Sequence, residues 1–99
     1  MRQAAKRDAN EEDIVDALTR CGHLVQRISG AGVPDLLVFS HSQGRLLLLE
    51  VKDGAKIPSA RKLTPAQQEW HRAWQSAPIY VVESVEEALD ACNKRLPRV

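Results

Sequence analysis

The chain has few aromatic residues and a low net charge. The first shortage limits the composition of its core, and the second limits how it could bind nucleic acid. Two tryptophans, one tyrosine and one phenylalanine are its aromatic residues among 99 positions, so the core must consist mainly of Leu, Val, Ile and Ala. The formal net charge is only +1, which is unlike that of a strongly basic DNA-binding protein. Any affinity for nucleic acid must therefore come from local basic patches, from dimerisation or from a metal ion that offsets acidic side chains.

Cysteine and long apolar runs are also scarce. Cys21 and Cys92 fall in predicted helices and fit no metal-binding spacing, so we expect buried or half-buried thiols in a reducing cytoplasm. No apolar run is long enough for a membrane span, and the first residues lack the apolar segment of a signal peptide. We expect one cytoplasmic domain over residues 1–99, with residues 1–9 as a flexible basic tail or, alternatively, an arm that touches a DNA backbone.

The most informative stretch covers residues 30–52 and is typical of a β-hairpin. Residues 36–40 and 45–51 are apolar strands, and residues 41–44 have the composition of a turn. If those four residues form the loop, Asp35 lies opposite Glu50, and Asp35, Glu50 and Lys52 project from one face at one end of the hairpin. Polar groups in otherwise apolar strands are expensive to bury, which favours a functional role for them.

The charges of these three residues indicate a chemistry. Two adjacent carboxylates repel each other unless a cation lies between them or one of them keeps its proton. Oxygen ligands without a thiolate suit Mg²⁺ or Mn²⁺ better than zinc. An ion bound there would polarise a phosphoryl oxygen and lower the pKa of a bound water, while Lys52 would orient that water or offset charge on the phosphate. The group therefore suggests metal-assisted phosphodiester hydrolysis.

The remainder of the chain predicts three helices and two more strands. The expected order is a helix over residues 11–21 capped by Asn10, a strand over 23–29, the hairpin, a helix over 65–75, a strand over 78–83 and a last helix ending near Lys94. Both faces of the hairpin are apolar and need a cover, and a strand reached through a helix runs parallel to its neighbour. We predict an α/β fold, an α/β/α sandwich of order αβββαβα with a four-stranded mixed sheet. His23 is expected at the surface. Trp70 and Trp74 are expected to pack on the sheet, or one of them instead forms a dimer contact.

Three short motifs resemble those of a known family. They are Gly32-Val33-Pro34-Asp35, Glu50-Val51-Lys52 and Leu63-Thr64-Pro65-Ala66-Gln67, and they are similar to the motifs of the VRR-NUC (virus-type replication-repair nuclease) family of the PD-(D/E)xK nuclease superfamily. The resemblance covers about residues 11–89 and implies a restriction-endonuclease-like fold. It also implies a stand-alone phage or bacterial endonuclease that acts as a homodimer on branched DNA such as four-way (Holliday) junctions.

The resemblance also implies roles for particular residues. Catalysis would fall to Asp35, Glu50, Lys52 and Gln67, and a Mg²⁺ or Mn²⁺ ion would be held by Asp35, Glu50 and the backbone carbonyl of Val51. For Gln67 the alternative is an amide that caps the start of its helix.

Other candidate contacts are less specific. Glu11 lies on the apolar stripe of the first helix and matches a family position, so it is either an additional metal ligand or a complement to the helix dipole. His71 resembles a recurrent family position and is either a catalytic base or a surface or packing residue. The candidate DNA contacts are Arg27, Gly30, Gly32, Lys56, Arg61 and Lys62. The alternative for Arg27 is an ordinary exposed charge, and the alternative for the two glycines is a plain turn. The alternative function is a catalytically silent nuclease-fold module that binds nucleic acid or a protein partner.

Overall fold

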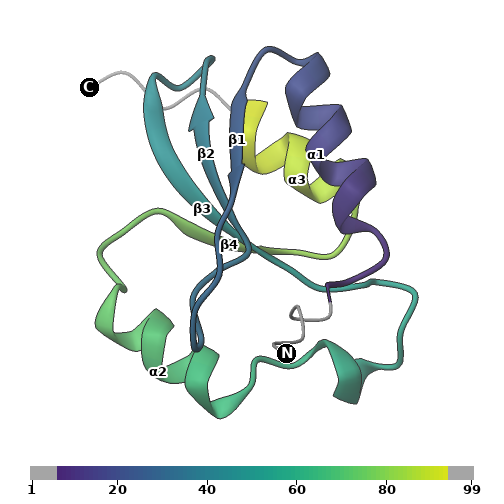
Figure 1. Cartoon of the computed structure of the whole chain (residues 1–99), viewed down its shortest axis with the longest axis vertical. Coiled ribbons are helices and arrows are strands. Elements are labelled where there is room, and N and C mark those ends of the chain that lie inside the picture. The colour runs from purple at the N-terminus through teal and green to yellow at the C-terminus, as the bar shows by residue number, and fades with distance from the viewer. Residues whose placement is uncertain (1–6, 94–99) are drawn as a thin grey trace, which may run out of the picture.

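A computed structural model of the protein describes residues 7–93, which form one four-stranded sheet with helices on both sides (Figure 1). In chain order the elements are α1 (Glu11–Arg20), β1 (Leu24–Arg27), β2 (Leu36–Ser40), β3 (Arg45–Val51), the short 3-10 helix η1 (Pro58–Arg61), α2 (Pro65–Ala73), β4 (Ile79–Val82) and α3 (Val85–Asn93). The predicted α/β class and αβββαβα order are confirmed. The expected helix end near Lys94 and positions 1–6 of the expected tail lie outside the described residues.

The sheet is mixed, as predicted, with strand order β1-β2-β3-β4. β1 and β2 are antiparallel, β2 and β3 are antiparallel, and β3 and β4 are parallel because α2 makes the crossover between them. Ser40 pairs with Arg45 and Leu36 pairs with Leu49, so the predicted hairpin register is confirmed. β1 is shorter than expected because the chain bends away at Gly30, after Ile28 has donated a last backbone hydrogen bond to the Asp35 carbonyl.

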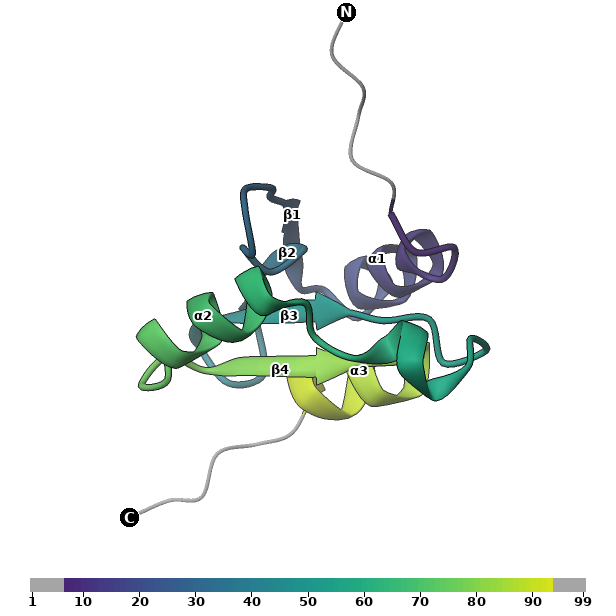
Figure 2. The ribbon, with the colours of Figure 1, turned by 90° about the horizontal axis from the view of Figure 1, so that it is seen from below.

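The hydrophobic core lies between the sheet and the helices α1 and α3, which pack side by side on one face of it (Figures 1 and 2). Alternate strand residues reach this core because successive side chains point to opposite faces. The buried set consists of aliphatic side chains, one alanine and one cysteine: Ile14, Leu18, Leu36, Val38, Leu47, Leu49, Val51, Val82, Ala88 and Cys92. The scarcity of aromatic residues is therefore reflected in a core without any aromatic ring among its fully buried residues in the described part of the chain.

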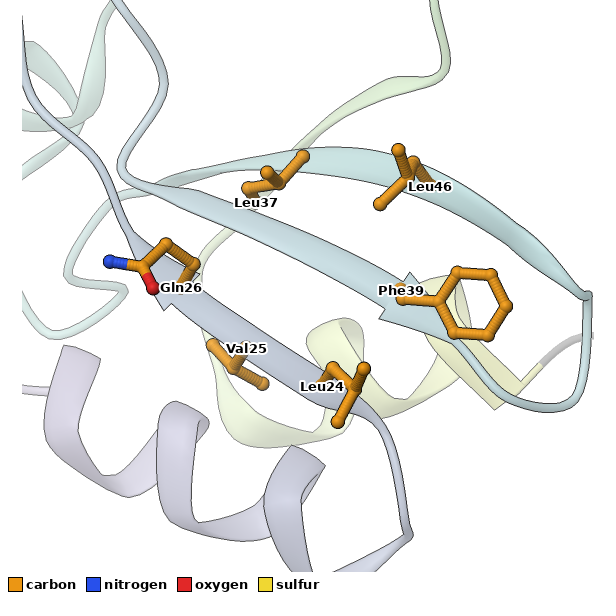
Figure 3. A pocket seen from close by; sticks show the side chains of 6 residues that line it. All are labelled: Leu24, Val25, Gln26, Leu37, Phe39 and Leu46. Atoms are coloured by element: carbon orange, nitrogen blue, oxygen red, sulfur yellow. The ribbon is translucent and has the colours of Figure 1, made fainter.

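The opposite face of the sheet is covered at one end only. α2 lies near the end of β3 that carries Glu50, because Gln67 of α2 hydrogen-bonds to the Glu50 carboxylate. At the other end an apolar groove of about 260 Å³ is open, lined by Leu24, Val25, Gln26, Leu37, Phe39 and Leu46 (Figure 3). Trp70 and Trp74 stack on each other with ring centroids 4.7 Å apart. Trp74 is exposed, so it does not pack fully on the sheet, and the alternative of a dimer contact stays a prediction.

Three local expectations differ from the structure. His23 is buried instead of exposed, because its Nδ1 accepts from the His41 N–H and its Nε2 lies 2.6 Å from Asn93 Oδ1. Cys21 is exposed, whereas Cys92 is buried as expected. Asn10 makes no side-chain cap on α1. Its amide instead donates to the carbonyls of Lys52 and Glu83, which ties the start of α1 to the ends of β3 and β4.

Among residues 7–93, no helix is both long enough and apolar enough to cross a bilayer.

Candidate active site

The hairpin brings Asp35 and Glu50 together at one end of the sheet. The pairing of Leu36 with Leu49 continues through a hydrogen bond from the Asp35 N–H to the Leu49 carbonyl, so Asp35 lies beside Glu50 as the sequence predicted. The Asp35 side chain also accepts a 2.7 Å hydrogen bond from the Val51 N–H. The backbone of β3 therefore holds Asp35 Oδ2 in place, whereas this hydrogen bond does not hold Oδ1.

Glu50 is an acidic side chain in an environment that opposes its charge. It is 1% exposed, and burial together with the negative charge of Asp35 raises the pKa of its carboxyl to about 8. Its Oε1 has no hydrogen-bond partner among the described residues. A buried carboxylate oxygen without a partner beside a second carboxylate fits an oxygen-preferring cation such as Mg²⁺ or Mn²⁺.

Lys52 and Gln67 complete the group around Glu50. Lys52 Nζ donates to Gln67 Oε1 at 2.8 Å and lies 4.0 Å from Glu50 Oε2. Gln67 Nε2 donates in turn to Glu50 Oε2 at 3.1 Å. The structure thus places all four predicted catalytic residues, Asp35, Glu50, Lys52 and Gln67, in one connected cluster.

Gln67 reaches this position because of how α2 begins. Thr64 caps the helix by accepting from the Gln67 N–H, and Gln67 Oε1 accepts from the Thr64 N–H at 2.8 Å, which makes a capping box. Pro65 occupies the first turn, where its missing N–H costs nothing. The two alternatives for Gln67 are therefore combined, since one amide both caps α2 and contacts Lys52 and Glu50.

His71 lies one turn further along α2 and also faces Glu50. Its Nε2 is 3.8 Å from Glu50 Oε1, which is too long for a hydrogen bond, and both atoms are buried and unpaired within the described part of the chain. Burial, and after it the charge of Lys52, lowers the pKa of His71. A neutral imidazole at this place can accept a proton or a hydrogen bond. The helical spacing of four between Gln67 and His71 is the sequence signal that places both on one face.

Glu11 lies in a different group from the one centred on Glu50. Arg7 Nη1 donates to both of its carboxylate oxygens at 2.9 Å, and Arg27 Nε donates to Oε2 at 2.9 Å. Arg7 also donates to the Ile28 carbonyl and lies 3.7 Å from Asp35 Oδ1. Within residues 7–93 no cluster of three or more His, Cys, Asp or Glu side chains has a metal-binding arrangement, so Glu11 does not join Asp35 and Glu50 in one. Arg7 precedes α1, which begins at Glu11, so helical spacing could not have identified this pair from the sequence.

The predicted glycines shape a cleft beside the site. Gly32 has φ +75°, and a Cβ there would lie 2.3 Å from the Ala66 carbonyl oxygen, so only glycine lets this loop approach the first turn of α2. The cleft has a volume of about 210 Å³ and is lined by Arg7, Ile28, Ser29, Gly30, Gly32, Val33, Asp35, Thr64 and Gln67. It opens directly onto the cluster described above, because Asp35 and Gln67 belong to both.

The basic residues that were predicted to contact DNA from the loop between β3 and α2 differ in whether they pair with acidic side chains. Lys56 is exposed and pairs with Asp8, Arg61 pairs with Glu83 at 2.9 Å, and Lys62 is exposed. Arg61 is thus partly occupied by holding η1 to the end of β4, which the sequence did not show. Roles of these residues toward DNA, and the metal role of the Val51 carbonyl, stay predictions.

Comparisons with known proteins bear on the identity of this cluster. No protein-family model and no curated protein matches the chain. A solved structure described as a VRR_NUC domain matches it with 27% sequence identity and a TM-score of 0.60, covering 79% of this chain and 84% of that chain. Together with the connected Asp35–Glu50–Lys52–Gln67 cluster, this likeness in fold and sequence supports a nuclease domain of the VRR-NUC type.

Proposed function

We propose that this domain is a Mg²⁺- or Mn²⁺-dependent endonuclease that hydrolyses phosphodiester bonds in branched DNA such as four-way junctions. The observation that carries the metal dependence is the pairing of Asp35 with the buried Glu50, whose Oε1 has no partner among residues 7–93. A divalent cation bound between the two carboxylates would relieve their repulsion and supply that partner.

The ligands proposed for this ion are Asp35, Glu50 and the carbonyl of Val51, and when bound it would act as a Lewis acid on a phosphoryl oxygen and acidify a bound water. The chain's own residues have separate tasks. Lys52 donates one N–H to Gln67, and its other N–H groups can donate to a phosphate oxygen or to the attacking water. Gln67 holds Lys52 against Glu50. His71 is available to accept a proton near Glu50.

The proposed active species is a homodimer, and two features support it. One domain of net charge +1 offers few basic groups against the phosphate charge of a junction, whereas a two-fold dimer offers twice as many and two cutting centres. The open groove on the sheet is lined by apolar residues and Gln26, so two copies could meet there without burying an unpaired charge. A bacterial or phage-infected cytoplasm is the proposed setting, on the basis of the family resemblance.

A cleavage assay tests the proposed activity. Labelled duplex, flap and four-way junction substrates are incubated with the protein in Mg²⁺, in Mn²⁺ or in EDTA. We expect cleavage with either metal, none in EDTA, and the highest rate on the junction. Equal rates on all three substrates would remove the branched-DNA preference and leave the nuclease.

The alternative is a catalytically silent module that binds nucleic acid or a protein partner. The complete set of predicted catalytic residues argues against it, because a silent module has no need to keep a buried glutamate beside a second carboxylate. Tight junction binding without cleavage in either metal would favour this alternative.

A further inference from the structure

Glu11 is the second acidic side chain that the fold buries, and its surroundings are cationic. It is 2% exposed, and both carboxylate oxygens already receive charged hydrogen bonds from Arg7 and Arg27. A buried carboxylate with these partners has its charge compensated, and removing one partner would leave that charge uncompensated. A metal ion could bind Glu11 only after these guanidinium groups had been displaced. The contacts therefore favour a role for Glu11 in holding Arg7 and Arg27 in position.

The group formed by Arg7, Glu11 and Arg27, called here the arginine clamp, carries a surplus of positive charge. Two guanidinium groups share one carboxylate in the clamp. Arg27 uses only its Nε for Glu11, and its two Nη atoms make no hydrogen bond to any of residues 7–93. The Arg27 side chain is 47% exposed and that of Arg7 is 29% exposed. The clamp therefore presents cationic N–H donors to solvent in a fixed position.

The clamp lies at the edge of the active site. Arg7 lines the 210 Å³ cleft together with Asp35 and Gln67, and its Nη1 is 3.7 Å from Asp35 Oδ1. The opposite wall is the first turn of α2, which Gly32 allows the loop to touch. If the scissile phosphate of a DNA strand lay at Asp35, the neighbouring part of the DNA backbone would therefore lie beside Arg7. Arg7 Nη1 and Nη2 are already engaged by Glu11 and by the Ile28 carbonyl, so within residues 7–93 the donors left for phosphodiester oxygens are Arg7 Nε, the second N–H of Arg7 Nη2 and the two Nη atoms of Arg27.

We infer that the arginine clamp is a phosphate-binding subsite for the phosphodiester adjacent to the scissile one, and that Glu11 is the positioning residue that orients Arg7 and Arg27. This inference rests on the proposed nuclease function, because it names a contact of the same substrate. It assigns Arg7 a role in substrate binding, and it gives Glu11 a role other than that of a metal ligand.

The first test measures DNA binding without cleavage. A labelled four-way junction and a labelled duplex are titrated with wild type, Arg7→Ala and Arg7→Lys in EDTA and in Ca²⁺ at several salt concentrations. We expect Arg7→Ala to weaken binding about tenfold and to reduce the salt slope by about one, because one phosphate contact is lost. Arg7→Lys should lose less, since it keeps the charge without the fork.

The matched control is Arg20→Ala. Arg20 is an exposed arginine in the last turn of α1, at the opposite end of the helix from Glu11. Its removal changes the net charge by the same amount as Arg7→Ala, and we expect binding to stay close to that of wild type. Equal losses in the two variants would mean that only overall charge matters, and this result would overturn the subsite.

The second test separates the two roles of Glu11. Under the inference, Glu11→Gln causes most of the loss in DNA affinity seen with Arg7→Ala and leaves Mn²⁺ affinity, followed by electron paramagnetic resonance, unchanged. A metal ligand would show the reverse, with lower Mn²⁺ affinity and unchanged DNA binding in EDTA. Glu50→Gln serves as the positive control for lost metal binding. Thermal unfolding of each variant checks that it folds, and Arg7→Ala provides the test on its own should Glu11→Gln not fold.

Methylphosphonate substitution locates the contact. Neutralising single phosphates on the junction should reduce wild-type affinity at the phosphate next to the cleavage position and cause no further loss in Arg7→Ala. Additive losses at every position would overturn the subsite while wild-type binding kept the proposed function intact. No binding by wild type in either EDTA or Ca²⁺ would overturn the proposed function together with the subsite.

Discussion

Burial determines how Glu50 behaves, because its carboxyl is enclosed where β3 meets α2 and lies beside a second acid. An unfolded glutamate has an ordinary pKa of 4.5, whereas burial and the charge of Asp35 raise the folded value to about 8. Between these values the folded protein binds more protons than the unfolded chain, so this residue makes the free energy of unfolding fall as pH rises through that window. The lowered pKa of His71 has the opposite effect on stability, because protonation of its partly buried ring opposes folding at low pH.

We predict that Glu50→Gln removes the contribution of Glu50 to the pH dependence of the unfolding free energy. In EDTA, the difference in unfolding free energy between Glu50→Gln and wild type should grow as pH rises from about 5 to about 8. Urea titrations at several pH values measure it, and comparing two proteins that share His71 cancels the histidine contribution. A difference that stayed constant with pH would contradict the raised pKa.

A second prediction at the residue scale separates chemistry from binding. Lys52 is buried and hydrogen-bonded to Gln67 within the cluster, whereas Lys62 is exposed on the loop before α2. Lys52→Ala should lower the cleavage rate at saturating DNA by far more than it lowers DNA affinity. Lys62→Ala should weaken binding and flatten its salt dependence with little change in the saturated rate. Single-turnover kinetics and titrations measure both quantities, and similar behaviour of the two variants would contradict this division.

At the scale of elements, the start of α2 is the support on which Gln67 depends. Thr64→Ala removes a cap and should destabilise the protein by about 1 kcal/mol. It should also slow cleavage, because the first turn that holds Gln67 against Lys52 and Glu50 would loosen.

Ser84→Ala is the matched control for this change. Ser84 caps α3 by accepting from the Glu87 N–H at 3.1 Å, and within residues 7–93 its side chain makes no hydrogen bond to Asp35, Glu50, Lys52 or Gln67. Its loss should cost a similar stability and leave the cleavage rate unchanged. Urea unfolding and rate measurements on both variants decide the point, and equal loss of activity would mean that stability alone governs the rate.

The sequence allowed the hairpin and its site to be predicted because both depend on local rules. Alternating side chains and a four-residue turn determine that Asp35 faces Glu50, and a Thr-Pro start followed by Gln67 marks the helix that covers them. What escaped prediction depends on contacts between distant segments. The bonds of Glu11 to Arg27, the burial of His23 by Asn93 and His41, and the pairing of Arg61 with Glu83 follow from packing that no local pattern reports.

The covering of the sheet was also only partly predictable. Two apolar faces indicated two helical layers, but the short α2 reaches only the carboxylate end of its face and leaves the groove around Phe39 open. A pattern of apolar residues shows that a surface needs a cover without showing whether the cover belongs to the same chain.

At the scale of the whole molecule, the proposed homodimer makes a prediction about that groove. Leu46 is 57% exposed and lines it, whereas Ile57 is 69% exposed on the loop before η1 and does not. Leu46→Glu should shift the protein toward monomer, because a charge would be buried at the contact. Ile57→Glu should leave the association unchanged. Sedimentation equilibrium over a wide concentration range measures this, and a monomeric wild type that still cut junctions symmetrically would contradict the dimer.

We propose that Asp35 and Glu50 form a metal-dependent catalytic centre, and the decisive measurement is cleavage of a labelled four-way junction in Mn²⁺. Wild type, Asp35→Ala, Glu50→Ala and the control Arg20→Ala are compared after circular dichroism has shown that each is folded. We expect the cleavage rate to fall by about a hundredfold or more in both carboxylate variants and to stay unchanged in Arg20→Ala. Full cleavage activity in a folded Asp35→Ala or Glu50→Ala protein would contradict this proposal.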